Sequence, residues 1–178
     1  MLTFQDCDLN TGLHFGARNG NFKICSLILD EAARVNCILN EKKNLDLITS
    51  LVNCRNTKGL TPLLSVAYRG YKSQSTKEGA TESRHLIVKK LLEYGANPNY
   101  CKPTNGMTAL HWLAYNNDDR AIKTLLEVKD GDGNSMTNHL VWTYDENLPV
   151  DIAGSMPSYA ALDTLLEHYS TTKNLHKP

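Results

Sequence analysis

Two neighbouring stretches decide the fold: Leu91-Leu-Glu-Tyr-Gly-Ala-Asn-Pro-Asn99 and Asn105-Gly-Met-Thr-Ala-Leu-His-Trp-Leu-Ala114. The first contains Gly95, and glycine is the residue that most easily enters the left-handed conformation that ends a helix. The second places Thr108, whose hydroxyl can cap a helix start, directly before an apolar run. Together they predict the end of one helix, a projecting turn and the start of the next helix.

Related stretches occur elsewhere in the chain. Thr11-Gly-Leu-His14 precedes an apolar series from Phe22 to Ile28 that has helical spacing. Leu60-Thr-Pro-Leu-Leu64 places threonine at a cap and proline at the first helical position, where its missing N–H has no cost. Leu148-Pro-Val-Asp-Ile-Ala153 is a degraded copy, because leucine and aspartate replace the threonine and the histidine. The pattern therefore predicts four repeated helix pairs.

These stretches resemble the ankyrin-repeat family. Thr108-Ala-Leu-His111 is similar to the T-P-L-H signature that opens such a repeat, and Gly95-Ala-Asn-Pro-Asn99 is similar to the G-A-D-V-N that closes one. Thr61 and Thr108 lie 47 residues apart, which exceeds the family period of about 33 by about 14. The 13 residues 71–83 and one extra residue before Gly106 account for the excess. The resemblance implies an all-α solenoid of stacked helix-turn-helix units with projecting β-hairpin fingers.

The predicted organisation is a single domain, 1–178, with enlarged connections. Its repeats are expected at 11–36, 54–99, 100–127 and 143–169, and its insertions at 37–51, 71–83 and 128–142. Ala32 stands where the family has glycine, so the helix there is expected to run on. A short inserted helix is expected to place Leu45, Ile48, Leu51 and Val52 on one face, and the tail from Ser170 is expected to be frayed.

Composition limits the function. Nineteen Lys and Arg balance nineteen Asp and Glu, so no global field favours nucleic acid, and no apolar run approaches the roughly 20 residues that cross a bilayer. Five cysteines without a C-x-x-C pair, and a start that does not read as a secretion signal, predict a reducing compartment. We therefore expect a cytoplasmic protein, with the nucleus as an alternative, that neither binds nucleic acid nor inserts into a membrane.

The residues with potential chemistry have structural interpretations. The resemblance implies that His14 and His111 bond near their own threonine and tie adjacent repeats. Asp130-Gly-Asp-Gly-Asn-Ser135 begins like a calcium loop, but it lacks the glycine at its sixth position and the glutamate at its twelfth. We therefore predict no catalytic residue, no metal and no cofactor. A catalytic role for His111 or Asp151 remains the enzymatic alternative.

The resemblance implies that a concave groove and the finger loops bind a partner protein. The groove positions are occupied by large side chains that can form hydrogen bonds, a type enriched at interface hot spots. Trp112 either extends this groove or packs between repeats. The basic finger residues indicate either a partner with an acidic patch or an ordinary solvated surface. The predicted partner-binding residues are Arg18, Asn19, Arg55, Lys58, Tyr68, Arg69, Lys102, Trp112, Tyr115 and Asn116.

The predicted function is a non-catalytic protein–protein interaction module, or scaffold. Two alternatives concern its context. The chain could be the cytosolic regulatory ankyrin segment of a larger membrane protein, such as a channel or an acyltransferase. It could also be a subunit of a large complex, docked by its inserted loops, because loops often carry function.

Overall fold

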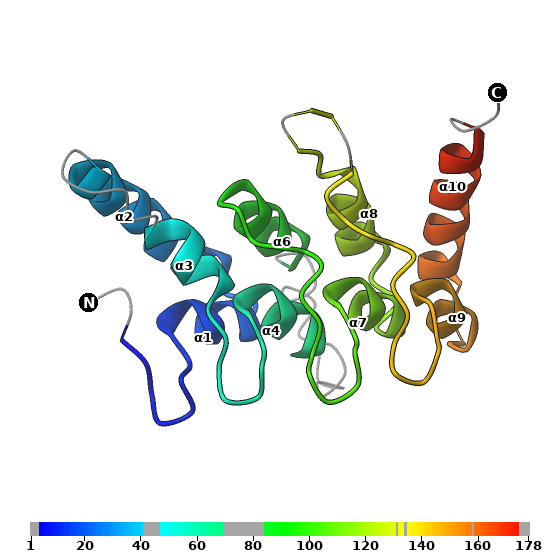
Figure 1. Cartoon of the computed structure of the whole chain (residues 1–178), viewed down its shortest axis with the longest axis horizontal. Helices are drawn as coiled ribbons and strands as arrows, with labels where there is room; N and C mark the ends of the chain where they lie inside the picture. The colour runs from blue at the N-terminus through cyan, green and yellow to red at the C-terminus, as the bar shows by residue number, and fades with distance from the viewer. Residues whose placement is uncertain are drawn as a thin grey trace.

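The computed structural model describes residues 4–40, 47–69, 84–130, 132–133, 135–157 and 159–174, and in these ranges the chain is helical without extended strands. Figure 1 shows the helices in two rows joined by loops that project on one side. One row contains α1 (Gly12–Arg18), α4 (Pro62–Arg69), α7 (Ala109–Tyr115) and α9 (Pro149–Gly154). The other contains α2 (Phe22–Asn40), α6 (Arg84–Glu93), α8 (Asp119–Glu127) and α10 (Ala160–Asn174), with α3 (Leu47–Asn53) beside α2. Neighbours in each row pack against each other in chain order.

Local signals start and stop these helices where the sequence predicts. Thr61 Oγ1 accepts a hydrogen bond from the Leu64 N–H at 3.2 Å, which caps α4, and Pro62 is its first residue. After α6, Gly95 has φ +84° and the Ala96 N–H donates to the Leu91 carbonyl at 3.0 Å. This six-residue closure satisfies a carbonyl that would otherwise lack a partner. Asn117, with φ +54°, ends α7 in the same way.

One continuous core lies between the two rows. Its leucines are fully buried and come from every repeat, among them Leu13, Leu63, Leu91, Leu110, Leu125 and Leu165. Burying each such side chain contributes about 1.5–3 kcal/mol. A single helix pair cannot bury both of its apolar sides, so each repeat depends on its neighbours for stability.

The fingers have a common register. A backbone bond closes each one, from Asp6 to Asn10, Asn56 to Leu60, Lys102 to Met107 and Thr143 to Asn147. The third spans one residue more than the others, which agrees with the extra residue predicted before Gly106. The β-hairpin prediction was too strong, because the described residues form only isolated bridges, such as Cys101 with Thr108. The sequence also missed the first finger, in which Leu9 has φ +60° where the next two fingers have glycine.

Several boundaries differ from the predicted ones. The outer helix of repeat one runs on past Ala32, as expected, and so includes the start of the predicted insertion 37–51. The tail prediction was wrong for 170–174, because α10 continues to Asn174 and the Ser170 and Thr171 hydroxyls bond carbonyls one turn back. Residues 71–83 and Leu45 lie outside the described residues. In the described part of the chain, no helix has the length and apolar character needed to span a bilayer.

Candidate binding surface

The two motif histidines tie repeats together. His14 is buried and its Nδ1 accepts from the Thr11 N–H at 3.2 Å, so the ring proton lies on Nε2. Nε2 then donates to the Leu60 carbonyl in the next finger at 3.0 Å. His111 repeats this arrangement with Thr108 and with the Asn147 carbonyl at 3.2 Å. Burial lowers the pKa of both histidines, which keeps the rings neutral. Both rings are therefore positioned as structural links.

Aromatic side chains gather where α4 meets α7. The Tyr68 and Trp112 rings meet edge to face with centroids 4.8 Å apart, and Trp112 meets Tyr115 at 6.2 Å. Trp112 is only 6% exposed, so of its two predicted roles it takes packing between repeats. Tyr68 and Tyr115 remain partly exposed on either side of it. We call Tyr68, Trp112 and Tyr115 the aromatic cluster.

Two cations from neighbouring fingers lie on aromatic faces. The Lys102 Nζ is 4.9 Å from the centroid of the Tyr68 ring, which joins this lysine to the aromatic cluster. The Arg55 guanidinium is 4.5 Å from the centroid of Tyr100. Such contacts contribute about 0.5–1 kcal/mol at exposed sites and hold the charge in place. Lys58 is exposed at the tip of the second finger.

The other predicted contact residues are less closely joined. Asn116 lies beside the aromatic cluster, but its side-chain amide donates to the Ala67 carbonyl at 2.7 Å and so links α7 to α4. Arg18 and Asn19 are exposed at the end of α1, one repeat away. The side chain of Arg69 lies outside the described residues. The structure thus brings together Tyr68, Lys102, Trp112, Tyr115 and Asn116.

Two polar residues outside the helices, Asn56 and Asp118, have structural roles. Asn56 is 9% exposed and bonds Asn10 in the preceding finger at 2.8 Å. Asp118 is 7% exposed, caps α8 through the Ala121 N–H and pairs with Arg84. Neither side chain is available to a partner. Sequence position alone shows that a residue is on a loop, but not that a neighbouring repeat covers it.

Sequence reasoning missed a second tie between repeats. The Asn53 amide donates to the Gly95 carbonyl at 2.9 Å, and its Oδ1 accepts from the Asn97 N–H at 2.8 Å. Asn99 makes the same pair of bonds with Met136 and Asn138. The signal was present, because both asparagines lie three residues before the start of a finger. Leu140 occupies the equivalent position in the last repeat.

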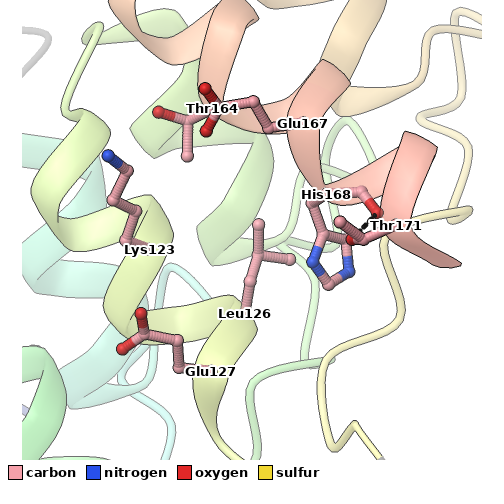
Figure 2. Close-up of a pocket in the computed structure, with 7 residues that line it drawn as sticks. All are labelled: Lys123, Leu126, Glu127, Thr164, Glu167, His168 and Thr171. Atoms are coloured by element: carbon pink, nitrogen blue, oxygen red, sulfur yellow. Dashed lines mark hydrogen bonds between the residues drawn. The ribbon is translucent and has the colours of Figure 1, made fainter.

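A cavity of about 230 Å³ lies on the opposite row, between α8 and α10 (Figure 2). Figure 2 shows its lining, which consists of Lys123, Leu126, Glu127, Thr164, Glu167, His168 and Thr171. None of the predicted contact residues belongs to it. Its charged groups have mixed sign and include no recognisable pairing of a nucleophile with a base. This cavity therefore gives no argument for a reaction.

The sequence singled out two further groups. Cys25 is fully buried, and burial raises its thiol pKa to about 12. In the acidic loop, Asp130 Oδ1 accepts from the Asp132 N–H at 3.0 Å, which accounts for that oxygen as a turn contact. The described residues contain no group of three or more metal-ligating side chains.

The geometry defines a class, namely a stack of helix pairs tied through histidine and asparagine, with aromatic and basic side chains on one surface. A family model described as ankyrin repeats (many copies) matches residues 78–126, which include α6, α7 and all of α8 except Glu127. This match confirms the predicted ankyrin resemblance over these residues. A comparison with curated proteins gave no match. Ankyrin repeats generally mediate protein–protein interactions and are typically non-catalytic.

Proposed function

We propose that this chain is a non-catalytic ankyrin solenoid that binds a partner protein through the groove formed by its inner helices and fingers. The observation that carries the proposal is the aromatic cluster with Lys102. Tyrosine supplies a large contact area and a polar tip, and it is enriched where interfaces gain most of their binding energy. Trp112 packs against the rings of Tyr68 and Tyr115, so these rings need little ordering on binding.

The positive charge near the aromatic cluster favours a negatively charged partner surface. Lys102, Arg55 and Lys58 lie on the two middle fingers, and the first two are already oriented by aromatic rings. An acidic segment bound along these fingers would contact cations that the aromatic rings already hold in place. Less side-chain entropy would therefore be lost on binding. We therefore propose a partner with an acidic patch beside an apolar anchor. Since electrostatic complementarity acts on association rates, binding should weaken as salt increases.

A photocrosslinking experiment tests the proposed location. Benzoylphenylalanine is placed at Tyr115, and at Lys89 on the exposed side of α6 as the matched control. Irradiation in native cell extract should give a discrete protein adduct from position 115 and none from position 89. Adducts from 89 alone would show that the partner docks on the other row, and equal adducts from both positions would show no preference for the groove. Either result would contradict the proposal.

A further inference from the structure

Repeat one exposes apolar side chains at positions that later repeats bury. Ile24 is 44% exposed, although the equivalent residues Ile87, Ala121 and Ala161 are completely buried. A terminal repeat of a soluble stack normally has a polar outer face, because no neighbour covers it. This end of the stack therefore has the character of an interface.

The exposed side of α2 includes Lys23, Asp30 and Cys37 beside a regularly spaced stripe. Cys25, Leu29 and Ala32 are completely buried, which fixes the inner side of this helix. Five exposed residues follow its other side at alternating intervals of three and four: Ile24, Leu27, Glu31, Arg34 and Ile38. This spacing is that of the contact seam between two packed helices. We call these five residues the α2 stripe.

The α2 stripe has a centre of pseudosymmetry. Leu27 lies four residues before Glu31, and Ile38 lies four residues after Arg34, so the centre lies between Glu31 and Arg34 and the apolar residues lie outside them. Glu31 and Arg34 form an exposed ion pair at 2.6 Å in the middle. If a second α2 is laid antiparallel over the first about this centre, Ile38 comes opposite Leu27. Glu31 and Arg34 then come opposite Arg34 and Glu31 of the second copy.

We propose that the protein forms a dimer of two copies through the α2 stripe, packed antiparallel about a two-fold axis between Glu31 and Arg34. An isologous interface must be self-complementary, and this stripe satisfies that requirement in both apolar content and charge. The stripe extends this far because Ala32 replaces the glycine that would end the helix. At about 1.5 Å per residue, the 19 residues of α2 span about 28 Å, and the extension supplies Arg34 and Ile38.

Head-to-tail stacking is the competing use of this end. It would require the last repeat to tie onto the first repeat of another copy. In the last repeat, however, Asp151 replaces the tying histidine and Leu140 replaces the tying asparagine. Asp151 instead accepts a bond from the Leu148 N–H at 2.8 Å. The two-fold arrangement needs neither tie, and it leaves the proposed groove open in both copies.

Charge reversal tests the dimer. Sedimentation equilibrium of the wild type, up to about 200 µM, should show the mass moving from one chain to two, because chains that associate with a dissociation constant on the order of micromolar are mostly dimeric at that concentration. Glu31→Arg or Arg34→Glu alone sets four like charges together and should weaken association at least tenfold. The double variant Glu31→Arg/Arg34→Glu should restore it. A wild type that stays at one-chain mass overturns the proposal, as do folded single variants that still dimerise.

Crosslinking tests the symmetry. In a Cys7→Ser/Cys37→Ser background, Glu31→Cys places a thiol beside the axis, and Lys123→Cys on α8 is the matched control. Mild oxidation should convert most of the Glu31→Cys chain to a covalent dimer and little of the Lys123→Cys chain. Equal yields from both would show random collision and would overturn the arrangement. Neither variant changes a residue of the groove. Loss of partner binding with the dimer intact would therefore count against the proposed function alone, and loss of the dimer with partner binding intact would count against the dimer alone.

Discussion

Replacing His111 with leucine removes the tie between the third and fourth repeats while keeping the site apolar and similar in volume. The change leaves the Thr108 hydroxyl and N–H and the Asn147 carbonyl without their histidine partner. A buried polar group left unsatisfied costs about 1–3 kcal/mol. Thr108 and the Asn147 carbonyl are two such sites, so the free energy of unfolding should fall by about 3 kcal/mol. In a chain of this length, that corresponds to a fall in Tm of roughly 6–12 °C.

Urea unfolding followed by circular dichroism measures the loss, and hydrogen exchange locates it. Amides of α9 and α10 should lose protection first, because the fourth repeat is the one released. His14→Leu is the matched control, since it removes the same bonds at the joint between the first two repeats. Its protection loss should appear in α1 and α2. Leu64 shows that leucine is accommodated at this position of the motif. A His111→Leu variant as stable as the wild type, or an identical exchange pattern in both variants, would refute the reasoning.

Two further predictions follow from the backbone and from the buried rings. The lowered pKa of His14 and His111 means that the unfolded chain binds more protons than the folded chain below about pH 6.5. The free energy of unfolding should therefore be nearly constant between about pH 7 and 7.5 and should fall as pH drops further, by up to about 1.4 kcal/mol per pH unit for each histidine. Urea midpoints measured from pH 7.5 to 5 check this, and a midpoint that rises on acidification would contradict it. Leu9→Gly and Glu146→Gly should each raise stability by up to about 1 kcal/mol, because both residues have positive φ. Gly106→Ala should instead lower the free energy of unfolding by about 2 kcal/mol or more, since its Cβ would lie 2.8 Å from the Tyr144 ring. Thermal melts should show a higher Tm for the two glycine variants and a lower Tm for Gly106→Ala. Equal changes in Tm for all three variants would count against the common finger register.

The repeat pattern was readable from the sequence because it rests on local chemistry. Thr61 and Pro62 start a helix, Gly95 stops one, and replacing that glycine with Ala32 lets a helix continue. The first finger was missed because Leu9 takes the left-handed conformation there without being glycine. Its strain is held by neighbouring contacts, such as the bond from the Thr57 N–H to the Asp8 carbonyl, that the local sequence does not reveal.

The candidate site was predictable only in part, because exposure depends on neighbouring repeats. The groove positions Tyr68 and Tyr115 could be named from the motif register. The burial of Trp112 depends on Tyr68, 44 residues earlier, and that of Asp118 depends on Arg84. The asparagine ties were visible as a pattern, but their partners are backbone groups of the next repeat. Long-range pairing of this kind has no signature in the sequence of a single repeat.

The central claim is that a partner binds across the middle fingers and the aromatic cluster. The measurement that tests it most directly is the dissociation constant of the crosslinked partner for the wild type, for Lys102→Glu and for Lys123→Glu, with folding checked by circular dichroism. Lys102→Glu reverses a charge at the proposed surface, whereas Lys123→Glu makes the same change on the exposed side of α8. The account predicts at least a tenfold loss of affinity, about 1.4 kcal/mol, for Lys102→Glu and less than a twofold change for Lys123→Glu. Equal affinities for the two variants, or a larger loss for Lys123→Glu, would contradict it.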